Sequence, residues 1–410
     1  MRTGVPVEVG VTGLGLLTPA GIGIEDNWAR ICSGQSTAAI DPDLAGEAIE
    51  FSCRVPGFDA AKEIGRTSAW RIDRFVQLAM VAARQAIADA GLDSSTWDGA
   101  RVGVVLGNSL GGSVTFEAQH KRFMDGGAER VSPLLIPMSM VNMVAGYVAI
   151  DTSARGPTLV TATACASGAT AIGTARELLR TDVCDVVLAG ATESALSPAV
   201  LAGLNQMGAL SKRASDPSAA SRPFDADRDG FVPGEGAAVL VLERVTDAVQ
   251  RGARLRGKVS GYASSSDAYH ATAPDPGGRG AERAMRDALA DAGLTTTDID
   301  HVNAHGTSTP LNDVTEGNAL HRVFGEAPAV TSTKGVTGHT LGAAGAIEAA
   351  FTLLAVERDA VPPTANLATV DADIPIDVVS GSARRKPVRA AMSNSFGFGG
   401  HNAVLVLTAA

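Results

Sequence analysis

The feature that most constrains the fold is a weak internal repeat, in which five segments of the first part of the chain resemble five later segments. The order is the same in both parts, whereas alanine-rich helices that resemble each other by composition alone would not preserve it. The period is too long for a solenoid, so the repeat predicts two related α/β halves. The matched pairs are residues 11–13 with 259–261, 83–92 with 285–294, 102–106 with 299–304, 161–165 with 331–335, and 238–242 with 403–407.

The two halves are predicted to span residues 1–255 and 256–410. With 410 residues and 45% hydrophobic content, the chain can bury a core of that size. Strand patterns alternate with helix patterns, which indicates mixed sheets covered by helices. The repeat also places two strand-to-helix junctions at equivalent positions. One carries Cys165, and the other carries Lys334 and His339.

Composition excludes several classes of function. The formal net charge of −10 disfavours nucleic acid as a partner. No uninterrupted apolar stretch reaches the roughly 18 residues of a membrane span, and the first residues lack the apolar run of a secretion signal. The four cysteines show neither CxxC nor metal-finger spacing, so we expect no disulfide framework, no zinc module and a cytoplasmic location.

Cys165 lies between an apolar run at 157–161, predicted to be a buried strand, and a helix pattern at 168–179. At a helix N-terminus the unpaired backbone N–H groups and the helix dipole favour a thiolate over a thiol. The position therefore predicts a nucleophile for covalent catalysis. The alternative is a buried cysteine that acts as a small hydrophobic side chain.

Three further segments place polar residues in apolar surroundings. His305 follows a predicted strand, Lys334 and His339 open the second junction helix, and residues 394–402 form a glycine-rich turn that permits close backbone approach. Taken singly, each has an ordinary alternative: a hydrogen-bonded histidine, a solvated lysine or a simple turn. Metal binding by Cys165, His305 and His339 is a further alternative. No metal is expected, because the chain has neither an HExxH pattern nor an accompanying carboxylate cluster.

Together these motifs resemble the elongating β-ketoacyl-acyl carrier protein synthases of the thiolase superfamily, closest to synthase II of bacterial fatty acid synthesis. The resemblance implies an α/β thiolase-like fold, with two pseudo-repeated α/β halves packed as an αβαβα layered sandwich. The first half would carry the nucleophilic cysteine, and the second half the catalytic histidines and lysine. The matching stretches, between residues 9 and 407, are 141–146, 155–157, 161–168, 221–225, 228–231, 302–310, 333–342 and 396–400.

The resemblance also implies a reaction, a decarboxylative Claisen condensation. An acyl chain moves from a carrier protein onto Cys165 as a thioester. Malonyl-carrier protein then loses carbon dioxide, and the resulting carbanion attacks the acyl-enzyme to give a 3-oxoacyl product. Both substrates are carried on the phosphopantetheine arm of the acyl carrier protein, so no cofactor is expected.

Roles follow for individual residues. The backbone N–H groups of Cys165 and Phe398 would form the oxyanion hole, and Phe398 would also act as a gatekeeper between the two substrates. His305 and His339 would stabilise the enolate formed on decarboxylation. This second histidine is typical of the elongating class. Lys334 would order the site and is expected to pair with Glu316.

The resemblance extends to substrate and carrier binding. Thr307 and Thr309 would hydrogen-bond the phosphopantetheine arm, Leu110 would bound the acyl pocket, and His270 would belong to a second mobile loop. Because the carrier protein is acidic and this chain is net negative, docking requires a local basic patch. The alternative for each docking residue is an ordinary solvated side chain, and Glu129 weakens the edge of the patch. The candidates are Arg66, Arg71, Arg74, Lys212, Arg213 and Arg130.

Three functions remain open at this level. The first is an elongating synthase of fatty acid synthesis, acting as a homodimer with acyl carrier protein. The second is the ketosynthase of a type II polyketide or polyene system, in a heterodimer with a chain-length-factor partner that lacks the cysteine. The third is a non-catalytic acyl-binding or scaffold protein with an unreactive Cys165.

Overall fold

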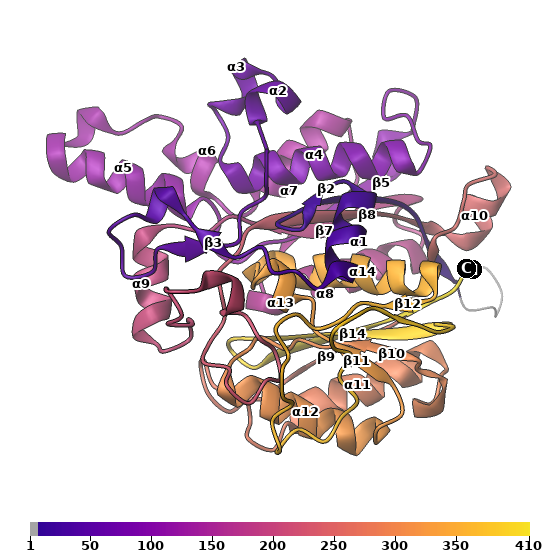
Figure 1. Cartoon of the computed structure of the whole chain (residues 1–410). Helices are drawn as coiled ribbons and strands as arrows, with labels where there is room; N and C mark the ends of the chain where they lie inside the picture. The colour runs from indigo at the N-terminus through magenta and orange to yellow at the C-terminus, as the bar shows by residue number, and fades with distance from the viewer. Residues whose placement is uncertain (1–6) are drawn as a thin grey trace.

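The computed structural model describes residues 7–410 and has five layers, which alternate between helices and strands (Figure 1). Two outer helical layers enclose two sheets, and a central helical layer lies between the sheets. The predicted αβαβα sandwich is therefore confirmed. The first outer layer contains α4 (Arg74–Asp89) and α7 (Met143–Thr152), the central layer α8 (Ser167–Arg180) and α14 (Ala344–Arg358), and the second outer layer α11 (Arg279–Ala292) and α12 (Pro310–Phe324).

The two sheets have the same topology. In each half the strands lie in the order third, second, fourth, fifth, first, and the second strand is parallel to the third and the fourth. This repeated order confirms the two predicted α/β halves. The first set is β1 (Val9–Thr18), β5 (Val102–Gly107), β6 (Thr158–Thr161), β7 (Val186–Glu193) and β8 (Gly236–Arg244). The second set is β9 (Gly257–Ser266), β10 (His301–Asn303), β11 (Ala329–Thr331), β14 (Ala390–Gly397) and β15 (His401–Thr408).

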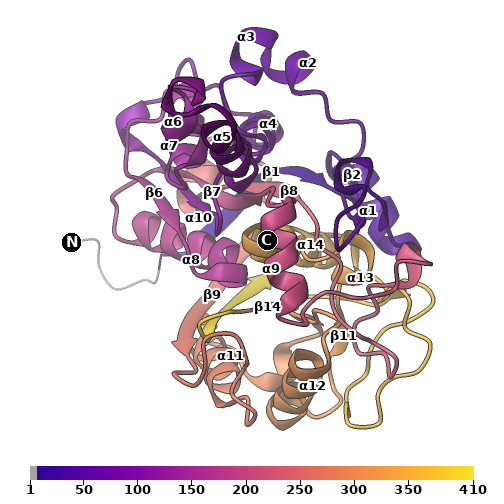
Figure 2. The same cartoon turned by 90° about the vertical axis from the view of Figure 1, so that its left-hand side faces the viewer.

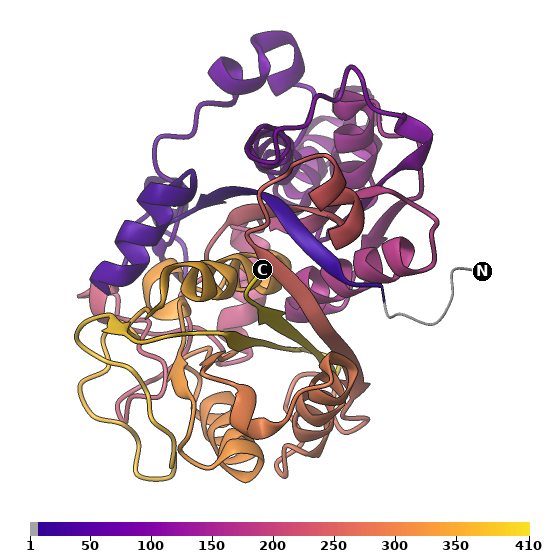
Figure 3. The same cartoon turned by 90° about the vertical axis from the view of Figure 1, so that its right-hand side faces the viewer.

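The two sheets join through their first strands. β1 pairs antiparallel with β9 at Gly10 and Val11, which makes the sheets hydrogen-bonded to each other (Figure 3). The gap between Arg244 at the end of β8 and Gly257 at the start of β9 contains the predicted division at residue 255, which stays a prediction.

Smaller elements surround these layers. No helix within residues 7–410 is both long and apolar enough to cross a membrane. The additional helices are α1 (Ile24–Ser33), α2 (Ala60–Ile64), α3 (Arg66–Ala69), α5 (Ser113–Gly126), α6 (Leu135–Ser139), α9 (Pro198–Gln206), α10 (Val245–Gln250) and α13 (Lys334–Thr337). The additional strands are β2 (Gly21–Ile22), β3 (Ala39–Ile40), β4 (Phe51–Ser52), β12 (Ala360–Val361) and β13 (Arg384–Arg385).

Equivalent glycines let an outer helix lie directly on the first strand of each half. A Cβ on Gly13 would lie 2.1 Å from the carbonyl oxygen of Ala86 in α4. A Cβ on Gly261 would lie 2.3 Å from the carbonyl oxygen of Ala288 in α11. The resemblance of 11–13 to 259–261 therefore reflects one packing requirement, met twice.

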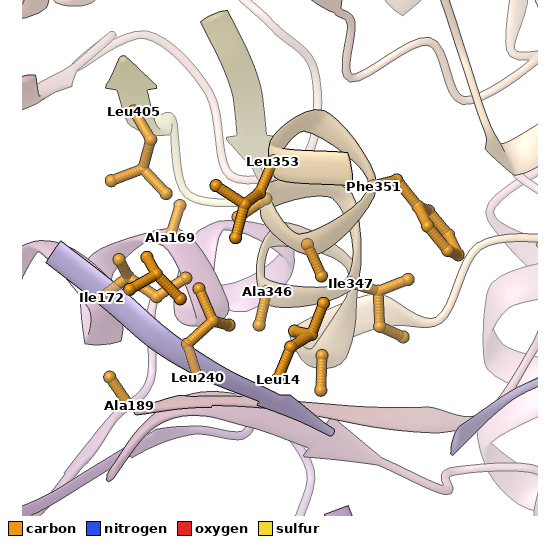
Figure 4. Packing of buried hydrophobic residues seen from close by; sticks show 14 of the residues in the cluster. Leu14, Ala169, Ile172, Ala189, Leu240, Ala346, Ile347, Phe351, Leu353 and Leu405 are labelled. Atoms are coloured by element: carbon orange, nitrogen blue, oxygen red, sulfur yellow. The ribbon is translucent and has the colours of Figure 1, made fainter. Parts of the chain in front are cut away.

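The central layer holds the main core. Residues 344–356 of α14 are all buried, because sheets and helices enclose this helix on every side. Figure 4 shows its side chains Ile347 and Leu353 packed between residues of both sheets, such as Leu240 and Leu405. This burial leaves the start of α14 in one position relative to both sheets.

Each central helix is preceded by a short 3-10 turn, at Ala164–Ala166 before α8 and at Leu341–Ala343 before α14. The first residue of each turn has a positive φ, 49° at Ala164 and 47° at Leu341. Cys165 is thus equivalent to Gly342. The predicted match of 161–165 with 331–335 therefore holds only where β6 and β11 end, and it fails for the residues that follow. The second half inserts α13 at this point, and the insertion carries Lys334. The prediction that 157–161 is buried is also wrong, because β6 lies at the edge of its sheet and Leu159 is exposed.

Candidate active site

Three predicted residues converge on one point in the structure. The Sγ atom of Cys165 lies 3.1 Å from Nε2 of His339. The ring of His305 stands edge-on to the ring of His339, with 5.4 Å between their centroids. One sulfur or nitrogen atom from each of the three buried side chains lies within 4.8 Å of the other two. The internal repeat thus places the two junctions face to face.

The turn that carries Cys165 is fixed by short hydrogen bonds around Ala164. The Ser167 hydroxyl donates to the Ala164 carbonyl at 2.6 Å and accepts from the backbone N–H of Thr163 at 2.9 Å. The Ser109 hydroxyl donates to the same carbonyl at 2.9 Å. These bonds hold Ala164 at positive φ, so the following thiol points away from α8 toward His339.

The turn after β14 lies against the nucleophile. The backbone N–H of Phe398 lies close enough to Cys165 to lower the pKa of its thiol. A Cβ on Gly397 would lie 2.7 Å from the Thr163 carbonyl oxygen and 3.0 Å from the Cys165 nitrogen, so a glycine is needed for this approach. The side chain of Phe398 is 36% exposed and lies beside the cavity. The arrangement suits the predicted oxyanion hole and gatekeeper.

The thiol is neutral in the resting site, contrary to the expectation of a stabilised thiolate. Burial raises the pKa of Cys165 to about 11, and the Lys334 ammonium and the Phe398 N–H only partly oppose this effect. Loss of water around the sulfur is the largest of these effects. A proton must therefore leave the thiol during catalysis, and Nε2 of His339 is in contact with the sulfur.

Lys334 is buried, at 1% exposure, and its ion-pair partner is Glu348 of α14. The predicted pairing with Glu316 is wrong, because both Glu316 carboxylate oxygens are occupied elsewhere. They accept the backbone N–H groups of His305 at 2.8 Å and Gly306 at 2.7 Å. Glu316 therefore supports the site by holding the loop of His305, not by neutralising Lys334.

Both histidines are neutral. Burial, together with the charge of Lys334, holds the pKa values of His305 and His339 well below their usual range. The Lys334 ammonium donates to the His305 carbonyl at 2.6 Å and lies 3.4 Å from Nδ1 of the same ring. An ammonium beside Nδ1 makes that nitrogen an acceptor, so this contact assigns the ring hydrogen of His305 to Nε2.

A cavity of about 570 Å³ opens over these residues. His270 does not line it. Its Nδ1 accepts the backbone N–H groups of Thr272 and Ala273, both at 3.1 Å, and these two residues do line the cavity. The predicted residues that line the cavity are Cys165, His305, His339, Phe398, Thr307, Thr309 and Leu110.

Some of the predicted docking residues form ion pairs within the protein, and others are exposed to solvent. Arg74 forms two hydrogen bonds to the buried Glu235, at 2.7 and 2.6 Å, which commits it to an internal ion pair. Arg213 lies 3.7 Å from Asp229. Helices α2 and α3 project from the first outer layer, as Figure 2 shows, and α3 carries the exposed Arg66. The other exposed candidates are Arg71, Arg130 and Lys212.

The sequence did contain a signal for the missed Glu348. It is the one charged residue between positions 341 and 356. A charge inside an apolar helix requires a partner, since burial without one is unfavourable. Glu193 is likewise the one charged residue between positions 186 and 206, a second apolar segment.

The thiol and the two imidazoles would also suit a borderline-soft metal ion such as Zn²⁺. The Lys334 ammonium beside His305 opposes the binding of a cation there. The expectation that the site uses no metal stays a prediction.

Comparison with protein families gives matches to the β-ketoacyl synthase N-terminal domain at residues 7–248 and to the β-ketoacyl synthase C-terminal domain at residues 256–368. The chain belongs to the β-ketoacyl synthase family. It is 45% identical to 3-oxoacyl-[acyl-carrier-protein] synthase 2 of Synechocystis over 405 residues, 97% of each chain. It is 42% identical to the protein of that name from Staphylococcus aureus over 407 residues, 98% of each. The predicted family and enzyme class, an acyltransferase, are confirmed.

Solved structures share the fold. A β-ketoacyl synthase from Burkholderia phymatum superposes with a TM-score of 0.93 at 35% identity, covering 98% of this chain and 100% of that one. The ishigamide ketosynthase/chain length factor gives 0.92 at 34% identity, covering 99% and 100%. A type II polyketide ketosynthase in complex with its acyl carrier protein gives 0.91 at 32% identity, covering 99% and 100%. The thiolase-like fold is confirmed.

The raised pKa of Cys165 predicts how its alkylation depends on pH. Below a pKa of about 11 the thiolate fraction grows tenfold with each pH unit. The logarithm of the iodoacetamide rate should therefore rise linearly from about pH 6 to about pH 10. The rate for Cys165→Ala, subtracted at each pH, removes the contribution of the other cysteines. A rate that levels off near pH 7 would contradict the neutral resting thiol.

Proposed function

We propose that this chain is an elongating 3-oxoacyl-[acyl carrier protein] synthase of fatty acid synthesis that works in the cytoplasm. It condenses an acyl chain held on Cys165 with malonyl-carrier protein. The observation that carries the proposal is the contact of the Cys165 thiol with His339, with His305 beside it, inside one cavity. A free, reactive thiol is consistent with a reducing compartment.

Acylation begins from the neutral thiol. The sulfur attacks the thioester carbonyl of the acyl-carrier protein, while its proton passes to Nε2 of His339, 3.1 Å away. The backbone N–H groups of Cys165 and Phe398 stabilise the oxyanion. When the intermediate collapses, the bond to the arm breaks and His339 returns the proton to the departing thiolate. The acyl group is then bound to Cys165, and no net charge has been created in the buried site.

Condensation uses both imidazoles as donors. Loss of carbon dioxide from the malonyl group leaves negative charge on its thioester oxygen, which accepts from the Nε2–H group of His305. Lys334 at Nδ1 keeps that hydrogen on Nε2. Once Cys165 is acylated, Nε2 of His339 no longer faces an S–H group. A shift of the single ring hydrogen of this neutral imidazole from Nδ1 to Nε2 then makes Nε2 the second donor. The carbanion then attacks the acyl carbonyl, and Cys165 leaves as a thiolate that takes up one proton from solvent.

The cavity suits a substrate with an apolar end and an amide-bearing arm. Thr307 and Thr309 line it, and their hydroxyls hydrogen-bond to each other at 2.8 Å. When the arm enters, its amide groups can replace this bond with hydrogen bonds to the two hydroxyls. Leu110 and Phe231 provide apolar surface. The proposed steps use only protein side chains and backbone N–H groups, with both acyl groups delivered on the arm and no cofactor.

Two surfaces support partner binding. The exposed Arg66, Arg71, Arg130 and Lys212 would attract an acidic carrier protein. The free edge of β6 and exposed apolar residues of the adjoining α5, α6 and α7 would pair with a second subunit, a further copy of this chain, because exposed edges and apolar patches favour association. These apolar residues are Val114 and Phe116 of α5, Ile136 of α6, Met140 directly after α6, Ile150 of α7 and Leu159 of β6 itself.

Acyl transfer to Cys165 can be measured directly. After incubation with acyl-carrier protein, intact-mass spectrometry should show one acyl group on the wild type and on Cys32→Ala, a matched control at a partly buried cysteine. Cys165→Ala should carry none. An adduct that persists on Cys165→Ala would refute the nucleophile. An unacylated wild type would favour the non-catalytic scaffold.

The same samples separate the two half-reactions. His305→Ala and His339→Ala should release carbon dioxide from malonyl-carrier protein about a hundredfold more slowly, because each removes an enolate donor. His305→Ala should still form the acyl adduct, since His305 takes no part in thiol deprotonation. Normal decarboxylation by both variants would refute the enolate roles.

The second candidate function is the ketosynthase of a type II polyketide or polyene system. It is favoured by the solved relatives described as a ketosynthase with a chain length factor, one of them 34% identical to this chain. Light scattering and condensation assays on the purified chain discriminate the two. An active homodimer is expected for fatty acid synthesis. A chain that is inactive until a homologue lacking the cysteine is added would support the polyketide system instead.

A further inference from the structure

Glu193 is a buried carboxylate that none of the steps above uses. It ends β7 and is fully buried. Its oxygens accept the backbone N–H groups of Ser109 at 2.8 Å and Leu110 at 3.4 Å, and the side-chain amide of Asn108 at 3.1 Å. Within residues 7–410 no cation forms an ion pair with it. The charge is therefore stabilised almost entirely by the loop that it holds.

The second half of the chain contains the matching arrangement. β5 and β10 are the equivalent second strands of the two sheets. Glu316 accepts two successive backbone N–H groups in the loop after β10, as Glu193 does in the loop after β5. Burial raises the pKa of both carboxyls to about 7, opposed by these same backbone hydrogen bonds. One carboxylate positions His305, and the other positions Leu110.

Leu110 separates two cavities. It lines the cavity of about 570 Å³ that contains Cys165, and it also lines a second cavity of about 290 Å³ between α5 and α9. No other residue lines both. Leu110 is therefore the side chain that an acyl chain extending from the first cavity toward the second would contact. The position of the Leu110 backbone thus sets how far an acyl chain can extend before it meets this side chain.

Glu193 also contacts the junction that follows His339. Its carboxylate lies against Gly342, where a Cβ would lie 2.7 Å from Oε2. The hydroxyl of Ser109 meanwhile donates to the carbonyl of Ala164, the residue before the nucleophile. The loop of Leu110 is thus anchored to both strand-to-helix junctions.

We propose that Glu193 is a positioning residue that fixes the Leu110 partition and so sets the length of acyl chain that the enzyme accepts. This inference rests on the proposed function, since it presupposes an acyl chain on Cys165. It assigns different consequences to two carboxylates that hold equivalent loops, Glu193 from the end of β7 and Glu316 from α12. Loss of Glu193 affects the choice of acyl chain, and loss of Glu316 affects the donor His305.

The experiment compares Glu193→Gln with Glu316→Gln in the full-length protein. An amide keeps one acceptor oxygen but presents an NH₂ group to the neighbouring donors, so the loop at 108–110 must shift. For Glu193→Gln, the ratio of kcat/KM for long over short acyl-carrier proteins should rise about tenfold, a change that a uniform loss of catalysis would not produce. For Glu316→Gln, decarboxylation should fall and the chain-length ratio should stay as in the wild type.

Leu110→Ala is the reference for an open partition and should raise the ratio in the same direction. The inference is overturned if Leu110→Ala changes the ratio and a folded Glu193→Gln does not. If Glu193→Gln does not fold, Glu193→Asp also tests whether the carboxylate positions Leu110. It keeps a carboxylate but, with one methylene fewer, moves it away from the loop at 108–110. A wild type that forms no acyl adduct would instead contradict the proposed function.

Discussion

The site depends on the close contact of two helices in the central layer. A Cβ on Gly168 in α8 would lie 2.4 Å from the backbone nitrogen of Ala346, and a Cβ on Gly345 in α14 would lie 2.7 Å from that of Ala169. The two contacts are reciprocal, as the internal repeat requires. Any side chain at either glycine forces the helices apart. Cys165 and His339 lie just before these helices, so the packing of α8 on α14 sets the distance between sulfur and imidazole.

This contact also determines the electrostatics. A junction enclosed between two sheets has little water, so burial raises the pKa of Cys165 and holds both imidazoles neutral. α13 places the Lys334 ammonium beside Glu348 and the His305 carbonyl. Removing one partner from such a buried pair typically destabilises a protein by about 3–5 kcal/mol. Neutral reacting groups beside one fixed cation form a preorganised environment for the negative charge that develops on the substrate.

The sequence predicted the features that recur within the chain. The order of matched segments gave the two halves, and the family motifs brought Cys165, His305 and His339 to one site. It did not predict contacts made by single residues across layers. The family resemblance suggested Glu316 as the partner of Lys334, but the Glu316 oxygens face the backbone of the His305 loop, and Glu348 pairs with Lys334 instead.

Other differences have the same cause. A helix N-terminus favours a thiolate, but burial raises the pKa of Cys165, and the depth of this residue depends on both sheets together. The basic character of Arg74 suggested a docking surface, but the buried Glu235 lies 161 positions later and binds it. The β6 edge was predicted to be buried because an apolar run does not reveal which strand ends a sheet.

The most direct measurement uses Gly345→Ala. This substitution removes none of the reacting groups and adds one methyl group between α8 and α14. Displacements of about 1 Å can reduce catalysis about a hundredfold. We predict a decrease of that size in both acylation of Cys165 and malonyl decarboxylation, in protein that still folds. Gly203→Ala on the exposed surface of α9, where a Cβ meets nothing within 4 Å, should behave as the wild type. A folded Gly345→Ala variant with wild-type rates in both half-reactions would show that the contact between the helices does not set the geometry of the site.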